Sequence, residues 1–258
     1  MKNEPTKSST VVPVVIIALV LVGVVGGAWY LYSQSKPATN ANTKPGATPA
    51  AKAATIPANA PSGANPPNML GSPTAAVTVE EFADFQCGSC GATHPILKEI
   101  QSTYGSKIRF IFREFPLPMH DKGYDAAVAA EAAGLQGKFW AMHDQLFTNQ
   151  ATWSSPSANA KELWNGYAQK IGLDVQQWQN DMAGLSAKSR VNQDMDRGKA
   201  ANISSTPSVF INGELVPFPE VNVAGLRKII DAKLQASGQA ETSGSTTSPV
   251  STAPPSNK

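Results

Sequence analysis

The two cysteines of this chain, Cys87 and Cys90, lie where the side-chain pattern changes from that of a strand to that of a helix. Residues 77–85 alternate between two faces, and one face carries Val77, Val79, Glu81, Ala83 and Phe85. After the cysteines, a single helical face carries Thr93, Leu97, Ile100 and Tyr104. The sequence therefore predicts a strand at 77–85 that leads directly into a helix at 87–104, with a Cys-x-x-Cys pair at the junction.

A thiol at the start of a helix is placed for redox chemistry. The first backbone N–H groups of a helix have no internal acceptor, and together with the helix dipole they favour an anion. A Cys87 thiolate would gain this stabilisation, since thiols so placed titrate at roughly 3.5–7.5 instead of about 8.5. Cys90 lies one turn further along the same face, close enough for a disulfide. We expect Cys87 to be the exposed, reactive thiol and Cys90 the sheltered thiol that resolves it.

Residues 11–32 form an almost wholly apolar segment without a charged side chain, and aromatic residues gather at its C-terminal end. Such a length can cross a bilayer core of about 30 Å. With Lys2 and Lys7 before it, the segment predicts a retained single-pass anchor, with residues 1–10 in the cytoplasm. A cleaved signal peptide is the alternative, although its apolar region is normally about 7–15 residues long. Both interpretations place the rest of the chain outside the cytoplasm, where disulfides persist.

Two further segments lack the large apolar side chains that a core needs. Residues 33–68 are rich in Ala, Pro, Thr, Asn and Ser, and residues 237–258 have a similar composition. Such segments cannot bury enough surface to offset the entropy of ordering, so the sequence predicts a disordered linker and a disordered tail. The remaining residues, 69–236, have the size of one domain. The formal net charge of +2 is too small to indicate nucleic-acid binding.

The predicted domain has strands on both sides of a long helical stretch. Residues 107–114 predict a second strand, parallel to the first through a right-handed crossover. Helical spacing then extends over about 120–201, in segments at 123–136, 138–149, 158–171, 174–185 and 186–201. Asn212-Gly213 is a strong hairpin signal between strands at 208–211 and 214–216, and a final helix is predicted at 222–236. The order is βαβ, a helical insertion, then ββα, which is an α/β fold.

This order, with Cys-x-x-Cys at the first strand–helix junction, resembles the thioredoxin fold. The helical insertion makes it similar to the DsbA-type thiol–disulfide oxidoreductases. The stretches that carry the resemblance are Leu70–Cys90, His94-Pro95, Arg113–Leu117 and Ser205–Gly213, the last reading Ser-Thr-Pro-Ser-Val-Phe-Ile-Asn-Gly. The similarity covers about residues 69–235. The Gly-Ser dipeptide between the cysteines departs from the Pro-His or Pro-Ser of well-known members, and this dipeptide tunes the redox potential in the family.

The resemblance implies a role for each site residue. Cys87 would be the attacking sulfur and Cys90 the resolving one. Thr206-Pro207 would be a cis peptide beside the disulfide, with a backbone that pairs with an extended substrate strand. Glu81 stands where the family carries a buried carboxylate, and its apolar strand face independently predicts a raised pKa and proton exchange with Cys90. His94 would border the substrate site and tune Cys87.

Plainer interpretations of the same residues stay open. The cysteines would form a structural disulfide, but a loop this short constrains the unfolded chain little. A zinc site needs about four ligands, and only His94, His120 and His143 are available beside the cysteines, so no metal is expected. Glu81 would lie at a wet sheet edge, and His94 would be an exposed or capping residue of its helix. Pro207 would be an ordinary trans proline at the start of a strand.

Together the residues and the resemblance predict a membrane-tethered oxidase of newly exported proteins that works without a cofactor. Its partners would be reduced exported proteins and a quinone-linked membrane oxidase of the DsbB or vitamin-K-epoxide-reductase (VKOR) type, with residues 11–32 in the membrane. A reductase or isomerase of the same fold is the nearest alternative. A non-catalytic tethered binding module, such as a chaperone or transporter accessory that uses the groove near Pro207, is an alternative of another class.

Overall fold

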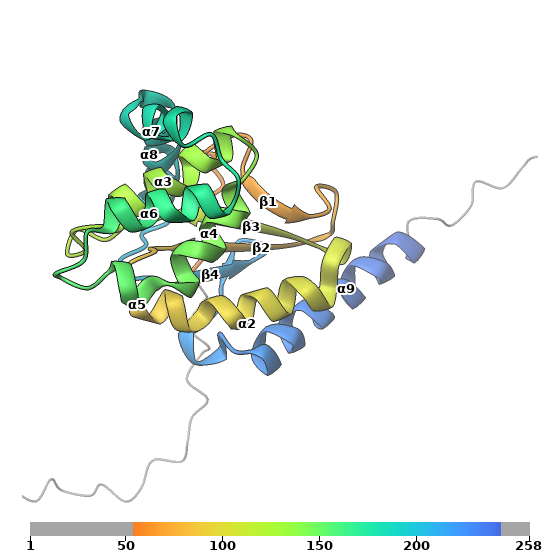
Figure 1. The fold of residues 1–258 in the computed structure, drawn as a ribbon. Coiled ribbons are helices and arrows are strands. Elements are labelled where there is room, and N and C mark those ends of the chain that lie inside the picture. The colour runs from red at the N-terminus through yellow and green to blue at the C-terminus, as the bar shows by residue number, and fades with distance from the viewer. Residues whose placement is uncertain (1–53, 244–258) are drawn as a thin grey trace, which may run out of the picture. The chain divides into compact units, whose positions relative to one another are not determined.

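The computed structural model describes residues 54–243, which form a five-stranded mixed sheet flanked by helices (Figure 1). The spatial order of the strands is β1-β3-β2-β4-β5. β2 and β3 are parallel, and the other neighbouring strands are antiparallel. The strands are β1 (Asn68–Gly71), β2 (Val77–Ala83), β3 (Ile108–Glu114), β4 (Ser208–Ile211) and β5 (Glu214–Leu215).

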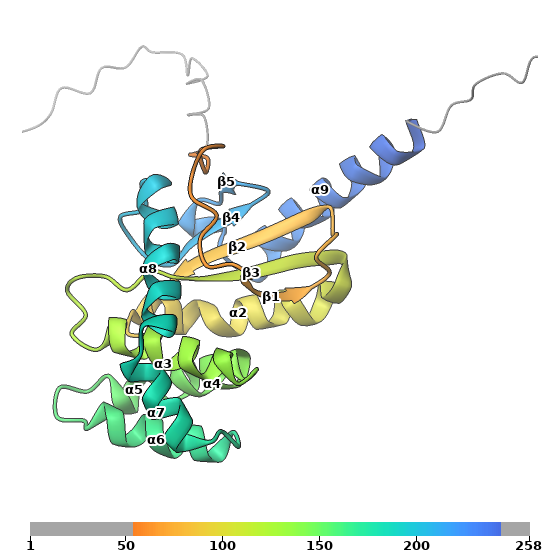
Figure 2. The same ribbon diagram turned by 90° about the horizontal axis from the view of Figure 1, so that it is seen from above.

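Helices cover both faces of this sheet. α2 (Gly88–Tyr104) and α9 (Val223–Ser243) run along one face, as Figures 1 and 2 show. The inserted helices between β3 and β4 are α3 (Gly123–Leu135), α4 (Phe139–Thr148), α5 (Gln150–Trp153), α6 (Ala160–Lys170), α7 (Val175–Ala183) and α8 (Leu185–Ala200). The last turns of α8 lie on the opposite face of the sheet, where Gly198 packs beside Phe82 of β2. Two short 3₁₀ helices, η1 (Gly105–Lys107) and η2 (Phe218–Glu220), complete the described elements.

The structure confirms the predicted order of elements. The strand at 77–85 is β2, the helix at 87–104 is α2, and the second strand is β3, parallel to β2. Asp174 caps α7 by accepting a hydrogen bond from the Gln177 backbone N–H at 2.9 Å. The sequence does not predict β1 or α5, because a four-residue strand and a single helical turn are too short to show a period.

The folded domain begins before residue 69, so the prediction of a disordered linker is wrong for residues 54–68. Thr55 pairs with Glu214 of β5, and Ala64 is fully buried. The guanidinium of Arg113 donates hydrogen bonds to the backbone oxygens of Ser62 at 2.9 Å and Ala64 at 3.0 Å. A buried cation needs acceptors, and the polar backbone of this segment supplies them although its side chains are small.

Other predicted segments lie outside the described residues. These are the N-terminus at 1–10, the anchor at 11–32 and the linker as far as residue 53. At the other end α9 continues to Ser243, so residues 237–243 are helical rather than part of a disordered tail. Among residues 54–243, no helix combines the length and the apolar character that a membrane span requires.

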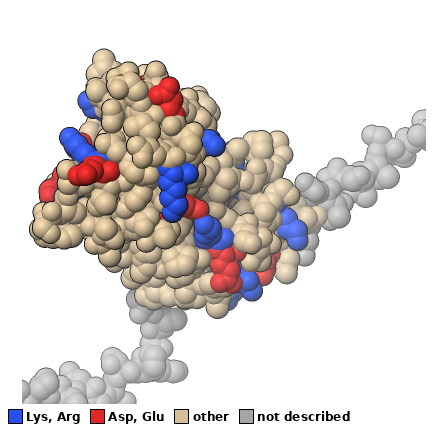
Figure 3. All heavy atoms as spheres, in the orientation of Figure 1, with Lys and Arg blue, Asp and Glu red and all other residues tan. Residues whose placement is uncertain are grey.

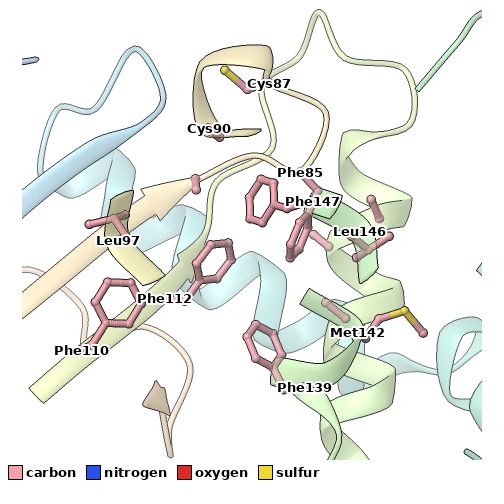
Figure 4. Packing of buried hydrophobic residues seen from close by; sticks show 14 of the residues in the cluster. Phe85, Cys87, Cys90, Leu97, Phe110, Phe112, Phe139, Met142, Leu146 and Phe147 are labelled. Atoms are coloured by element: carbon pink, nitrogen blue, oxygen red, sulfur yellow. The ribbon is translucent and has the colours of Figure 1, made fainter. Parts of the chain in front are cut away.

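Each face of the sheet has its own hydrophobic core. In the larger core, Phe85 stacks on Phe112 with ring centroids 5.3 Å apart, between the sheet, α2 and α4 (Figure 4). In the smaller core, Phe82 meets Phe115 and Phe210 edge to face, at 6.3 Å and 5.8 Å. Phe82 and Ala83, which are adjacent in β2, lie in opposite cores, as the alternation in the strand sequence predicts.

The charged side chains form no single-sign field on the face seen in Figure 3. Lys and Arg side chains alternate there with Asp and Glu side chains, and most of the visible surface is uncharged. A protein that binds nucleic acid normally presents a basic stripe. This face therefore agrees with the near-neutral formal charge of the chain.

Candidate active site

Cys87 is the N-terminal cap of α2 and lies at the edge of the sheet where the parallel strands β2 and β3 end. Its backbone is extended, with φ −70° and ψ 121°, and its N–H donates to the Asp84 carbonyl at 3.0 Å. Both cysteines are free thiols, so the structure represents the reduced form. Cys87 retains 8% of its surface and Cys90 none. The predicted order of exposure is confirmed, although Cys87 is more enclosed than expected, and its sulfur points away from the aromatic core in Figure 4.

Hydrogen-bond donors converge on the Cys87 sulfur. They lower the pKa of Cys87 to about 5, led by the Cys90 thiol, with further contributions from Thr206 and from the backbone N–H groups of Cys90 and Ser89. The last two are first-turn amides of α2, which is the anion-binding effect predicted for this position. The Thr206 hydroxyl is buried and has no hydrogen-bond partner while Cys87 is a thiol, so it is free to donate to a thiolate.

The Thr206-Pro207 peptide is cis and lies beside Cys87. The backbone oxygen of Thr206 accepts a hydrogen bond from the Cys87 thiol at 3.4 Å. The cis assignment came from the family resemblance alone, because an X-Pro bond is cis in only about 5–6% of folded cases. The structure confirms the assignment, and the alternative of a trans proline is wrong.

Glu81 and Cys90 form a buried acidic pair beneath the reactive sulfur. Glu81 is 3% exposed, and burial raises its pKa to about 8. Burial also raises the pKa of Cys90 strongly, helped by hydrogen bonding to Cys87 and by the nearby Glu81 carboxyl. The predicted buried position of Glu81 is confirmed, and the alternative of a wet sheet edge is wrong.

His94 faces α4 and not the Cys87 sulfur. Its ring stacks on Phe147 at 5.1 Å, lies 5.1 Å from the His143 ring, and places Nε2 3.7 Å from Asp144 Oδ1. Burial lowers the pKa of His94 to about 4, so the ring is neutral at physiological pH. His94 is not among the main groups that shift the Cys87 pKa. The ring therefore packs between α2 and α4, and the expected role of His94 at the substrate site stays a prediction.

The histidines weighed as zinc ligands separate into two places. His120 Nδ1 lies 2.6 Å from Asp84 Oδ2, whereas His94 and His143 gather with Asp144. Donor atoms of that second group lie within 4.8 Å of one another, the one such group among residues 54–243. Lys98 already pairs with Asp144 there, and neither cysteine belongs to the group.

Sequence reasoning did not single out two residues that hold the backbone near Cys87. Asp84 is buried and accepts hydrogen bonds from the backbone N–H groups of Gln86 at 2.7 Å and Leu117 at 2.8 Å, joining the two loops beside the site. Gln150, the first residue of α5, donates to the backbone oxygens of Phe85 at 2.6 Å and Cys87 at 2.8 Å. The spacing of Asp84 before the helix hints at a turn-forming role, but nothing local to residue 150 points to residue 87.

Curated relatives match only part of their own length. The chain is 35% identical over 152 residues to Na⁺/H⁺ antiporter NhaA 1 of Mycolicibacterium gilvum, covering 57% of this chain and 23% of that protein. It is 36% identical over 147 residues to antiporter NhaA 3 of Salinispora tropica, covering 57% and 22%. The chain therefore spans less than a quarter of the length of these antiporters.

Solved structures match over most of their length. A thioredoxin-like oxidoreductase from Silicibacter pomeroyi is 29% identical with a TM-score of 0.55, covering 66% of this chain and 92% of that one. BdbD from Bacillus subtilis, in its oxidised form, is 24% identical with a TM-score of 0.59, covering 68% and 98%. The thiol–disulfide exchange protein α-DsbA2 from Wolbachia pipientis is 20% identical with a TM-score of 0.56, covering 65% and 87%.

A family model described as thioredoxin matches residues 64–232. That range contains Cys87, Cys90, Glu81 and the cis Thr206-Pro207 peptide, and it includes the inserted helices α3 to α8. Because the match covers more than half of the chain, and because the fold is that of the DsbA-type structures, the protein belongs to the thioredoxin family.

Proposed function

We propose that the protein is a thiol–disulfide oxidoreductase that forms disulfides in exported proteins through Cys87 and Cys90. The observation that carries the proposal is the asymmetry of the two thiols. The pKa of Cys87 is lowered to about 5 while the pKa of Cys90 is raised, so one sulfur leaves as a thiolate and the other holds its proton. A structural disulfide has no need of such a difference.

The reaction begins with Cys87 and Cys90 joined as a disulfide. A substrate thiolate attacks Cys87 Sγ, a mixed disulfide forms, and the Cys87–Cys90 bond breaks with both electrons going to Cys90. Cys90 takes up a proton, and Glu81, with a pKa of about 8, is the buried acid placed to supply it. A second substrate thiolate attacks the substrate sulfur, and Cys87 leaves as a thiolate. The substrate loses two electrons, and the Cys87–Cys90 pair gains them.

The cis Thr206-Pro207 peptide supplies the binding edge for the substrate. Its backbone borders Cys87, and an extended peptide would pair with it by main-chain hydrogen bonds. The Thr206 hydroxyl stabilises the Cys87 thiolate at the moment of departure. A stabilised thiolate stabilises the reduced enzyme, and this makes the oxidised form the stronger oxidant.

The cellular setting follows from the N-terminal sequence. We place residues 11–32 in the cell membrane as a single-pass anchor, with the catalytic domain on the extracytoplasmic side. Reduced exported proteins are then the substrates. A quinone-linked membrane thiol oxidase of the DsbB or VKOR type would reoxidise the Cys87–Cys90 pair, and the anchor keeps both reactions near the bilayer.

The test uses the full chain, purified in detergent and oxidised, with reduced ribonuclease as the substrate. We expect ribonuclease to gain disulfides in step with loss of the enzyme disulfide. Cys87→Ser should abolish this transfer. Cys90→Ser, first converted to the mixed disulfide of Cys87 with glutathione, should release glutathione when a substrate thiolate attacks Cys87 and should accumulate a mixed disulfide between Cys87 and the substrate. An oxidised enzyme that leaves ribonuclease reduced, with Cys87→Ser behaving like the wild type, contradicts the proposal.

The alternatives give different results in the same preparation. A reductase of this fold would show a strongly reducing potential in a titration against glutathione. An accessory module that binds a transporter has one observation in its favour, the similarity to part of two sodium–proton antiporters. Such a module would keep its binding after both cysteines are replaced by Ala.

A further inference from the structure

Gln150 connects the inserted helices to the backbone of the redox centre. It begins α5, and its side-chain amide nitrogen donates to the Phe85 oxygen at 2.6 Å and to the Cys87 oxygen at 2.8 Å. These two carbonyls bracket the residue that precedes the reactive cysteine. One NH₂ group has two hydrogens, so a single side chain satisfies both carbonyls.

We propose that Gln150 is a positioning residue for thiol–disulfide exchange, and that through it the inserted helices set the oxidising strength of the Cys87–Cys90 pair. The proposal rests on the proposed function and adds a named determinant to it. Gln150 does not touch the sulfur. It acts on the backbone that carries the sulfur.

The Cys87 carbonyl already accepts the helical hydrogen bond from the Gly91 N–H at 3.1 Å. The Gln150 amide adds a second donor to that oxygen and thereby fixes the first turn of α2. The same turn aims the N–H groups of Ser89 and Cys90 at the Cys87 sulfur, where they favour the thiolate. A looser turn would weaken those donors, so the thiolate would lose stability.

The electrostatic effect of Gln150 has the same direction as its geometric effect. The Cys87 carbonyl belongs to the same residue as the sulfur and carries negative partial charge, and the amide hydrogens of Gln150 offset that charge and the charge of the Phe85 carbonyl. The main groups that lower the Cys87 pKa are uncharged donors, namely Cys90, Thr206 and the amides of Ser89 and Cys90. Because neutral groups set the pKa of Cys87, one further pair of neutral donors is expected to change that pKa measurably.

Gly91 offers a second way to test the contact without changing Gln150. A Cβ at position 91 would lie within 2.4 Å of Gln150 Oε1 and 3.0 Å of its Cδ. The atoms it would meet belong to the far end of a flexible side chain. Gly91→Ala therefore displaces the amide, while alanine is the better helix former by about 1 kcal/mol. This variant separates loss of the contact from loss of the fold.

The experiment compares Gln150→Met with a matched control, Gln136→Met, in the full chain. The Gln136 side chain also binds backbone groups, but both partners lie within the helical insertion and neither is a cysteine. It donates to the Asp174 oxygen at 3.1 Å and accepts from the Asp174 N–H at 3.0 Å. The readouts are the ultraviolet titration of the Cys87 thiolate and the equilibrium with glutathione. Both are measured beside the unfolding midpoint of each variant.

We expect Gln150→Met to raise the Cys87 pKa by roughly half to one pH unit, the weight of one neutral hydrogen bond. The equilibrium with glutathione should shift roughly two- to tenfold toward the disulfide form, which makes the enzyme a weaker oxidant. Gly91→Ala should shift both quantities in the same direction. Gln136→Met should lower the unfolding midpoint and leave both quantities at the wild-type value.

Two results would overturn the proposal. One is an unchanged Cys87 pKa and glutathione equilibrium in Gln150→Met and Gly91→Ala, which would make the contact merely structural. The other is an equal shift in Gln136→Met, which would trace the effect to general loosening of the insertion. A wild-type enzyme that fails to oxidise ribonuclease, while the Gln150 variants still shift the thiolate titration, would reject the proposed function and leave the positioning role standing.

Discussion

Neighbouring groups at the redox centre reach opposite protonation states at neutral pH. Cys87 meets hydrogen-bond donors that favour its anion, whereas Cys90 and Glu81 are enclosed by apolar groups that favour their neutral forms. Cys87 and Cys90 are only one helical turn apart. In thiol–disulfide exchange the negative charge therefore forms on the less buried sulfur, Cys87, and the proton stays with the more buried Cys90 and Glu81.

The buried Glu81 carboxyl makes stability depend on pH. Its pKa is about 8 in the folded chain, above an ordinary value of 4.5. Between those values the unfolded chain has lost a proton that the folded chain keeps, so stability falls as pH rises from 4.5 to 8. Glu81→Gln should remove this fall and stabilise the protein at pH 7 by about 1–3 kcal/mol.

The measurement is chemical unfolding of the wild type and Glu81→Gln across this pH range. The gain should vanish near pH 4, where both forms of the wild type carry the proton, and this point is the internal control. In the ribonuclease assay the same variant should be slower, because Cys90 loses its nearby acid. A stability difference that does not change with pH would contradict the protonation argument.

α8 is bound to the sheet by charge and by close packing at once. Arg197 reaches Glu80 of β2, with Nε 2.8 Å from Oε1, and these charges hold the pKa of the Glu80 carboxyl below its ordinary value in spite of burial. One residue on, Gly198 lies against the rings of Phe115 and Phe82. The helix pattern predicts α8, but it does not show that its polar residues face the sheet.

Two glycines in helix interiors give opposite predictions. A Cβ at Gly198 would lie 2.5 Å from two Phe115 ring atoms, whereas a Cβ at Gly166 in α6 would meet nothing within 4 Å. Gly198→Ala should destabilise the fold by about 1–3 kcal/mol through overpacking. Gly166→Ala, the matched control, should stabilise it by roughly 0.5–1 kcal/mol through helix propensity alone. Thermal unfolding of both variants checks the pair, and a stabilised Gly198→Ala would show that the α8–sheet contact is loose.

At the scale of the whole molecule, a buried ionic network joins three distant parts of the chain. Arg113 of β3 pairs with Glu80 of β2 at 2.7 Å and with Asp194 of α8 at 2.8 Å. The segment at 62–64 closes the network, since its carbonyls accept from Arg113 and the Ala64 N–H donates to Asp194 at 2.7 Å. Removing a partner from such a network leaves buried charge without compensation.

Truncation tests whether this N-terminal segment belongs to the folded unit. A fragment of residues 69–243 should be less stable than one of residues 54–243 by roughly 2–4 kcal/mol, because Arg113 and Asp194 lose charge-assisted hydrogen bonds. Urea unfolding of both fragments measures the difference. The same truncation should cost less in an Arg113→Met background, where the acceptors have no cation to bind. Equal stability of the two fragments would mean that water replaces the segment without loss.

Local patterns of residues were enough to predict the junction of β2 and α2, the Cys-x-x-Cys pair at that junction, the β4–β5 hairpin and the extent of most helices. These features depend on the spacing of residues close together along the chain, and that spacing is visible in a pattern. The cis state of Thr206-Pro207 was predictable only through resemblance to a family. The tertiary structure alone decided that Gln150 holds the Cys87 turn, that His94 serves the α2–α4 contact, and that residues 54–68 are folded. These facts depend on which backbone and side-chain groups, distant in the sequence, become buried together and must find partners. Such long-range requirements produce no periodic pattern in the sequence.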